Sequence, residues 1–463
     1  MDEKDALIAK LFEEIACLKK IVERQSARIS ELEKRLNKNS QNSSKPPSSD
    51  GFKKQARFKT KSLREKGKLP SGGQAGHPGE TLKQVAHPDK TIIHALSNCP
   101  HCALDLKSSA VDGLVKRQVF DIPPPKIEVT EHQVELKYCG GCERTVQSPF
   151  PPEVTAPVQY GANIRSYSVY FNQAQLIPED RLQQIFADIF KVSISTATLV
   201  SFGVGLSKTL QPFMSSVLQH IKTATRKHLD ETGFRIGSQT QWLHVASNDA
   251  VTYYHISPKR KSLLSKLKGI VCHDHWKPYY QLKRVKHALC NAHHIRELNA
   301  LIEYEHEAWA KKMKRLLYFA LKWKTHHQGC IPKDQQKRLF ILYNKIMVEG
   351  WKYHESLPSY SPKPARGRLA HRTGYNLLMR LSNYRADVLR FMTVPEVPFS
   401  NNQAEQDIRM MKVKQKISGG FRTTEGAEVF ITIRSFISTM RKQGKNIFDS
   451  LAAAVIGNVP TVA

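Results

Sequence analysis

The sequence predicts an α/β protein whose strand-rich core is interrupted by a helical insertion and preceded by a coiled coil and a β-rich zinc ribbon. Three observations support this fold class. Residues 1–38 place apolar side chains at alternating steps of three and four, residues 91–153 contain two Cys-x-x-Cys pairs, and residues 226–299 hold short strand-like runs. At 463 residues the chain is too long for one compact core, and about three folded units are expected.

The charge balance predicts a polyanionic partner. The chain has 71 Lys and Arg against 41 Asp and Glu, a net charge of +30. An excess of this size favours nucleic acid as the partner, and a basic protein that binds none is the plainer alternative. The N-terminus is charged, and no apolar run approaches the roughly 18 residues of a membrane span. We therefore expect a cytoplasmic protein that associates with the nucleoid and has no membrane partner.

Residues 1–38 are expected to form a leucine-zipper coiled coil of about four heptads. Charged residues fill most positions outside the apolar seam, and Gln25 is its single polar member. An amphipathic helix that packs on its own chain is the alternative. The unbroken spacing instead favours a homo-oligomer joined through this segment. The seam consists of Ile8, Leu11, Ile15, Leu18, Val22, Gln25, Ile29, Leu32 and Leu36.

A basic flexible linker is expected over residues 39–90. Its Ser-, Pro- and Gly-rich stretches cannot bury a core, and residues 51–68 contain eight Lys or Arg against one Glu. Such a segment suits contacts with DNA phosphates, for which Lys53, Lys54 and Arg57 are candidates. A solvated linker without a specific role explains the composition nearly as well.

A zinc-binding domain is expected over residues 91–153. Its two Cys-x-x-Cys pairs are separated by strand-like stretches at Lys126–Thr130 and Gln133–Leu136. Paired knuckles at the ends of β-hairpins make a tetrahedral thiolate site for one structural Zn²⁺, the zinc-ribbon arrangement. A redox pair or free thiols are the alternative, and His101 is a candidate replacement for one ligand. The expected ligands are Cys99, Cys102, Cys139 and Cys142.

Residues 154–225 are expected to be helical. Ile177–Asp180 begins one helix, and a break at Lys191–Ser195 separates it from a second helix that starts near Thr196. This pattern suits a helix-turn-helix whose second helix enters a DNA major groove. A helical hairpin that only packs against its neighbours fits the pattern equally well.

A ribonuclease-H-like α/β core is expected over residues 226–299 and 396–430. An antiparallel strand set that begins with one Asp, followed by a central strand that ends in another, is the order of that fold. Residues 300–395 are rich in Leu, Lys and Trp at helical spacing and indicate a helical insertion, and residues 431–463 a C-terminal helical element. The strand-like runs lie at 241–246, 251–256, 269–272 and 287–290.

Three acidic residues in the core have distinct settings. Asp230 lies at a strand position, Asp274 follows a short apolar run, and Glu405 lies early in a predicted helix. Two strand aspartates and one distant helical glutamate suit a site for two Mg²⁺ ions, which prefer hard oxygen ligands, in phosphodiester chemistry. Each acid alone is more often a surface carboxylate, but together they predict a catalytic, metal-binding triad.

Helical spacing distinguishes Glu405 from its neighbour Asp407. If the helix begins at Ser400 or Asn401 as N-cap, apolar residues between Ala404 and Met411 form its buried stripe. Asp407 then lies roughly 200° around the helix from Glu405 and points elsewhere. Basic side chains beside Glu405 and in the segment that follows are expected to contact DNA phosphates. These residues are Arg409, Lys412, Lys414, Lys416 and Arg422.

Five segments of the core stand out as motifs: Asp230–Thr232, His273–Trp276, Leu289–Leu298, Asn401–Glu405 and Lys414–Arg422. Together they resemble the large transposase of bacterial insertion sequences of the insertion sequence sixty-six family. That family also has an N-terminal leucine zipper, a Ser/Pro linker, a four-cysteine zinc segment and a short C-terminal element. The resemblance therefore extends over nearly the whole chain.

The resemblance implies DDE transposition, in which Asp230, Asp274 and Glu405 occupy the catalytic positions. The expected activity is cleavage of DNA at the ends of an insertion sequence and transfer of those ends into target DNA. Small accessory proteins of the same element are implied as further partners. The histidines on both sides of Asp274 differ from the commoner forms of the family.

Two other classes of protein compete with a transposase. A ribonuclease-H-like nuclease or resolvase uses similar acids but does not need the zipper and ribbon. A non-catalytic DNA-binding regulator keeps the zipper and basic arm but has no need of three acids in these settings.

Two pairs of residues near the acids have less defined roles. Cys290 and His293 form a Cys-x-x-His pair, for which packing is favoured over a second metal site because only two ligands are evident. His273 and His275 are expected to position DNA or to order the Asp274 loop.

Overall fold

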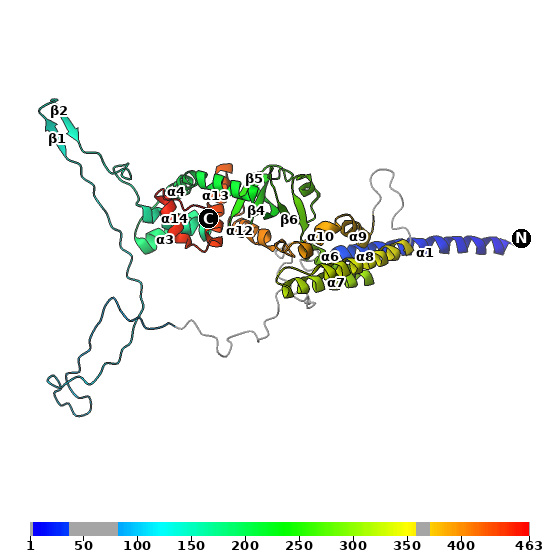
Figure 1. The fold of residues 1–463 in the computed structure, drawn as a ribbon, viewed down its shortest axis with the longest axis horizontal. Coiled ribbons are helices and arrows are strands. Elements are labelled where there is room, and N and C mark those ends of the chain that lie inside the picture. The colour runs from blue at the N-terminus through cyan, green and yellow to red at the C-terminus, as the bar shows by residue number, and fades with distance from the viewer. Residues whose placement is uncertain (1–2, 37–81, 358–370, 463) are drawn as a thin grey trace. The chain divides into compact units, whose positions relative to one another are not determined.

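The computed structural model of the chain describes residues 3–36, 82–357 and 371–462 (Figure 1). Contacts divide the chain into two compact units, residues 56–130 and the rest of the chain. The expected DNA-contacting residues Lys53, Lys54 and Arg57 lie outside the described residues. Among the helices that are described, none combines the length and the apolar character needed to cross a membrane.

The N-terminal segment is one helix, α1 (Glu3–Leu36), as its spacing predicts. The apolar seam is exposed in the single chain, with Leu18 at 59% and Ile29 at 56% of full exposure. A partner helix covers such a stripe in a coiled coil, which is why α1 suits self-association. The coiled coil itself stays a prediction.

The cysteine-rich segment, residues 91–153, contains less β-sheet than the sequence predicts. Its strands are β1 (Leu136–Cys139) and β2 (Arg144–Gln147), which form an antiparallel hairpin. The strand predicted at Lys126–Thr130 is wrong, and that predicted at Gln133–Leu136 shares only its last residue with β1. Strand propensity shows that residues suit a sheet, but a strand also needs a neighbour to accept its hydrogen bonds.

The segment before the main sheet is helical, as predicted. The turn between its second and third α-helices passes through Lys191, whose φ is +57°, and Ser195 then caps the next helix by accepting the Thr198 N–H at 3.1 Å. The elements are α2 (Ala162–Val169), the π-helical η2 (Tyr170–Ala174), α3 (Glu179–Phe190), α4 (Thr196–Thr209) and α5 (Gln211–Thr223).

A five-stranded mixed sheet follows, with the strand order β5-β4-β3-β6-β7. β3, β4 and β5 pair antiparallel, while β6 and β7 run parallel to β3. Gly269 leads into β6 with φ +77°, and a side chain there would collide with the Thr225 carbonyl, so this position requires glycine. The strands are β3 (Arg226–Ile236), β4 (Gln239–Ser247), β5 (Thr252–Ser257), β6 (Ile270–His273) and β7 (Lys286–Leu289), with the 3-10 helix η3 (Lys277–Gln281) before β7.

Helices cover both faces of this sheet. Side chains alternate along β3, so apolar residues point to each face and pack against helices there. Leu229 joins an apolar cluster with residues of α5 and of α13 (Thr424–Lys442), whereas Phe234 joins a cluster with residues of α12 (Asn402–Ser418). α13 also packs on α4 and on α14 (Ile447–Val455). The domain boundary expected at residue 430 falls inside α13, so the C-terminal element is continuous with the core.

Residues between β7 and α12 are helical where they are described, as the sequence predicts. These helices share an apolar core that includes Trp309, Leu317, Tyr343 and Leu377 and reaches Leu289 of β7. They are α6 (Asn291–Tyr304), α7 (Ala308–His326), α8 (Lys333–Ser356), α9 (Thr373–Asn383), α10 (Arg385–Val388) and α11 (Arg390–Thr393).

Candidate active site

Asp230 lies within β3, and Asp274 directly follows the neighbouring parallel strand β6. β3 and β6 are in register at His228 and Cys272, and each aspartate lies two residues further along. The Asp230 carboxylate accepts the Glu231 N–H at 2.9 Å, and the Asp274 carboxylate accepts the Trp276 N–H at 2.9 Å. The parallel pairing therefore brings together two acids that are far apart in the sequence.

The surroundings of Asp230 concentrate negative charge. Burial raises the pKa of Asp230, and the carboxylates of Glu231, Asp274 and Glu405 raise it further, in that order, to about 8. Like charges at a partly buried position disfavour the ionised form, and a bound dication removes that penalty. Asp230 thus interacts with both other members of the predicted triad.

Asn401 joins α12 to the strand that bears Asp230. Its side-chain amide donates to the Leu229 carbonyl at 2.7 Å, and its Oδ1 lies 2.8 Å from Nδ1 of His228. Its backbone N–H donates to the Cys290 sulfur at 3.1 Å. Asn401 is the N-cap of α12, which is one of the two expected positions. Its side chain makes no capping bond because it is hydrogen-bonded to β3 instead.

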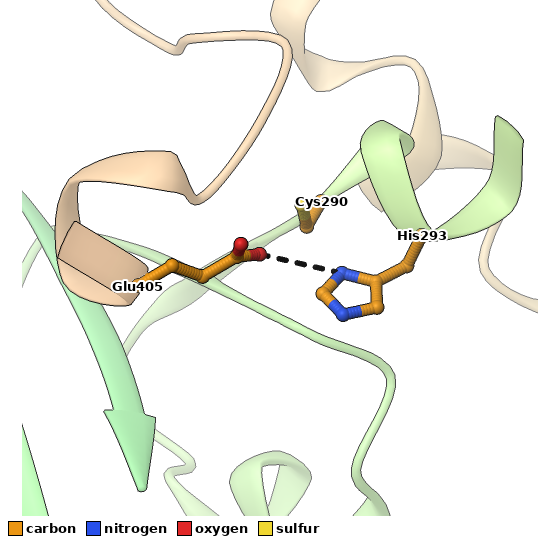
Figure 2. Close-up of side chains that lie close together, drawn as sticks. All are labelled: Cys290, His293 and Glu405. Carbon is orange, nitrogen blue, oxygen red and sulfur yellow. Dashed lines mark ion pairs between the residues drawn. The ribbon is translucent and has the colours of Figure 1, made fainter. Parts of the chain in front are cut away.

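Glu405 lies one turn into α12 and faces α6. Its Oε2 is 3.6 Å from Nη2 of Arg296, and its Oε1 is 3.9 Å from Nδ1 of His293 (Figure 2). Asp407 instead forms an ion pair with Lys442 of α13 at 2.8 Å. The two acids therefore lie on different faces of α12, as the helical phase predicts. The predicted buried stripe is also present, at Ala404, Ile408 and Met411.

His293 and Cys290 are neighbours at the start of α6. Burial lowers the pKa of the His293 imidazole, but the Cys290 sulfur beside it outweighs burial and raises that pKa to about 9. Cys290 is only 3% exposed. One ligand atom of each of Cys290, His293 and Glu405 lies within 4.8 Å of the other two.

A second buried acid, Glu231, is held beside the aspartates. Arg260 donates to its Oε1 through Nε at 3.0 Å and Nη2 at 2.6 Å, and the Tyr279 hydroxyl donates to its other oxygen. The Arg260 guanidinium also contacts two indole rings, at 5.0 Å from the centre of Trp242 and 4.3 Å from that of Trp276. Burial nevertheless raises the pKa of Glu231.

The histidines that flank Asp274 pack into the protein. His273 is buried, its Nε2 lies 2.9 Å from Nδ1 of His287, and its Nδ1 contacts the Asp274 carbonyl. His275 packs against the Tyr384 ring at 4.6 Å between ring centres. Burial lowers the pKa of His273 to about 3 and that of His275 to about 4. The contact with the Asp274 carbonyl suits an ordering role for His273, which stays a prediction.

The basic residues expected to contact DNA fall into two groups. Arg409, Lys416 and Arg422 are exposed. Lys414 is buried at 9% exposure, and Lys412 donates to the Gly233 carbonyl at 3.0 Å, so both are directed into the protein. The expectation that these side chains contact DNA is corrected for Lys412 and Lys414, because α12 packs on β3.

Each cysteine pair forms the same kind of local turn. Backbone N–H groups of His101 and Cys102 lower the pKa of Cys99, and those of Cys142 and Gly141 lower the pKa of Cys139. The residue after each pair is left-handed, with φ +62° at Ala103 and +53° at Glu143. N–H groups directed at sulfur favour the thiolate, which is the form that binds zinc.

A mixed α/β core with clustered acids, together with paired cysteine turns, defines a multidomain protein with a zinc-finger segment. A family model described as the transposase IS66 family matches residues 157–429. The zinc-finger binding domain of transposase IS66 matches residues 97–143, and a family of unknown function matches residues 1–83. The first match covers more than half of the chain, so the chain belongs to the transposase IS66 family.

One curated relative is the uncharacterized protein y4jO of Sinorhizobium fredii. It is 30% identical over 116 residues, which are 22% of this chain and 36% of that protein. The chain therefore spans little more than a third of the length of this relative.

Sequence reasoning missed several residues that shape the site. The sequence did not indicate the roles of Asn401, Arg296 and Arg260, because their partners, on β3, α12 and β3 respectively, are distant in the sequence. Glu231 directly follows Asp230. Because neighbouring side chains of a strand point to opposite faces, the sequence indicated that these two acids have different surroundings.

Proposed function

We propose that the chain is a DDE transposase that cleaves DNA at the ends of an insertion sequence and transfers those ends into target DNA. The observation that supports this most is the parallel register of β3 and β6, which aligns Asp230 with Asp274 while α12 brings Glu405 to the same region. Membership of the transposase IS66 family agrees with this reading.

We further propose that the core is ribonuclease-H-like. Three antiparallel strands followed by two strands parallel to the first, in the order β5-β4-β3-β6-β7, support this assignment. The helices between β7 and α12 are then an insertion, which separates Glu405 in the sequence from the two aspartates.

The acid cluster fits divalent magnesium. Asp230, Asp274 and Glu405 offer hard oxygen ligands, and the mutual repulsion that raises the pKa of Asp230 is relieved when a dication binds. Two such ions supply Lewis-acid stabilisation to the attacking and leaving oxygens of an in-line displacement. The three carboxylates would hold them, and Arg296 and Asn401 would keep Glu405 and α12 in position.

Cleavage hydrolyses a phosphodiester bond, and joining exchanges one phosphodiester bond for another; each step forms one P–O bond and breaks one. In cleavage, a water oxygen attacks phosphorus and the DNA 3′-oxygen leaves; in joining, that 3′-hydroxyl attacks a target phosphorus and a target 3′-oxygen leaves. Exposed Arg409, Lys416 and Arg422 follow Glu405 in the sequence and suit contacts with the DNA backbone.

The remaining segments suit assembly on DNA. We propose that Cys99, Cys102, Cys139 and Cys142 bind one structural Zn²⁺, which the match to the zinc-finger family supports. We also propose that α1 pairs two or more chains, that the protein acts at the nucleoid, and that small accessory proteins of the element assist it. Pairing through α1 would bring two catalytic cores to two element ends.

Amide replacement of each acid tests this function. Asp230→Asn, Asp274→Asn and Glu405→Gln should each abolish cleavage and joining of labelled element ends in Mg²⁺ while end binding persists, because a ligand charge is lost at little change in shape. Glu428→Gln, at an exposed position of α13, is the matched control and should stay active. An active Glu405→Gln variant would contradict the assignment.

A nuclease or resolvase is the second candidate, since it would use the same acids. Incubation with labelled ends and a target plasmid separates the two. A transposase yields joined products, whereas a nuclease yields only cut ends.

A further inference from the structure

Two buried polar atoms beside the acid cluster have no hydrogen-bond partner. They are Oε1 of Glu405 and Nδ1 of His293, and they face each other across 3.9 Å (Figure 2). Buried groups of this kind are costly unless something binds them, which makes an unpaired couple a signal of a missing ligand. A third donor, the Cys290 sulfur, completes a set whose ligand atoms all lie within 4.8 Å of one another.

The donor set suits a zinc ion. Thiolate, imidazole and carboxylate bind Zn²⁺ at about 2.0–2.3 Å, which places tetrahedral neighbours about 3.4 Å apart. The 3.9 Å between the His293 and Glu405 atoms needs only a small side-chain adjustment to reach that spacing. A sulfur and a nitrogen donor favour zinc over magnesium, which prefers oxygen alone.

The backbone already orients these donors. Cys290 precedes α6 and His293 lies in its first turn, so the Cys-x-x-His spacing places both at one helix end. The Asn401 N–H donates to the Cys290 sulfur at 3.1 Å, as N–H groups do around metal-bound thiolates. Arg296 pairs with Oε2 of Glu405 and leaves Oε1 for a metal.

We propose that Cys290, His293 and Glu405 form a second zinc site, distinct from the four-cysteine segment, and that zinc bound there withdraws Glu405 from the acid cluster. The site has three protein ligands and an open fourth position. The packing role that the sequence favours for Cys290 and His293 is thus replaced by metal binding. Zinc binding follows from the donor set alone, whereas its inhibitory effect rests on the proposed transposase function.

Glu405 is the residue that the two sites share. In this structure its carboxylate faces His293 and Arg296. One carboxylate cannot bind zinc through Oε1 beside His293 and also complete a magnesium centre at the two aspartates. Zinc is therefore expected to oppose the active arrangement.

Zinc titration of the full-length protein against a fluorescent chelator tests the binding. Wild-type protein should bind two equivalents, and Cys290→Ser, His293→Gln and Glu405→Gln should each lose one of them. Cys330→Ser and His326→Gln alter an exposed cysteine and an exposed histidine elsewhere and should keep both equivalents. Circular dichroism checks that each variant is folded. Cys290→Ser, His293→Gln and Glu405→Gln variants that bind as many equivalents as the wild type would overturn the site.

Strand transfer in Mg²⁺ with added zinc tests the inhibition. At free zinc ten times the dissociation constant of the second site, about one molecule in eleven stays zinc-free, so wild-type activity should fall about tenfold. Each protein is compared with its own zinc-free activity, and His293→Gln should retain most of its own. Unchanged wild-type activity at full occupancy would refute the inhibition. A protein inactive in Mg²⁺ alone would instead count against the proposed function, and the titration would still decide the zinc site.

Discussion

Replacing Asn401 should loosen the junction between β3 and α12. In Asn401→Ala, the Leu229 carbonyl loses a donor at 2.7 Å and Nδ1 of His228 loses its partner at 2.8 Å. His228 and Asn401 are only 2% and 3% exposed, so water cannot readily replace these bonds. Each buried group left without a partner costs about 1–3 kcal/mol, which predicts a loss of about 2–6 kcal/mol in the free energy of unfolding.

The adjacent Asn402 provides a matched control. It is exposed at the first position of α12, and Asn402→Ala should change the free energy of unfolding by less than about 0.5 kcal/mol. Urea unfolding followed by tryptophan fluorescence measures both variants, because Trp242 and Trp276 report on the sheet. Equal unfolding midpoints for Asn401→Ala and the wild type would refute the claim that this side chain holds α12 on β3.

Activity gives an independent check on the same junction. The Glu405 N–H donates to the Asn401 carbonyl at 3.3 Å, so a shift of the helix start moves the third acid. A displacement of about 1 Å in a catalytic group can cost about 100-fold in rate. Strand transfer by folded Asn401→Ala should fall to that extent, whereas Asn402→Ala should match the wild type. Full activity in a destabilised Asn401→Ala would separate stability from the positioning of Glu405.

Three further predictions concern other parts of the chain. Cys142→Ser should remove one zinc equivalent and unfold the cysteine-rich segment, because metal binding and folding are coupled there; a folded, zinc-free wild type by metal analysis would contradict this. The double substitution Leu18→Glu and Ile29→Glu places charges in an apolar seam and should abolish self-association, measured by light scattering, and the joining of paired ends. Salt-sensitive DNA binding should be retained. Arg260→Ala should lower the free energy of unfolding by about 1–3 kcal/mol in urea, because Glu231 keeps a buried charge without its cation, and Arg260→Lys should recover only part of this. Wild-type stability in Arg260→Ala would show that Tyr279 alone satisfies Glu231.

Local sequence patterns determined much of the organisation. The period of the apolar residues specified α1 and the helices between β7 and α12, and the same period distinguished Glu405 from Asp407. The Cys-x-x-Cys spacing specified two equivalent turns, and the apolar stripe of α12 matched its buried face. These features depend on residues within one or two turns of each other, which is why one sequence is enough to find them.

Tertiary structure alone decided which distant residues meet. The bridge from Asn401 to Leu229, the pairing of Arg260 with Glu231, and the approach of Cys290 and His293 to Glu405 all join separate elements. The strand predicted at Lys126–Thr130 failed for the same reason, since a strand needs a partner that local propensity does not specify. Lys414 was expected on a surface that contacts DNA, but tertiary packing of α12 buries its charged side chain. Contacts between distant segments depend on the packing of the whole core, and no local period encodes them.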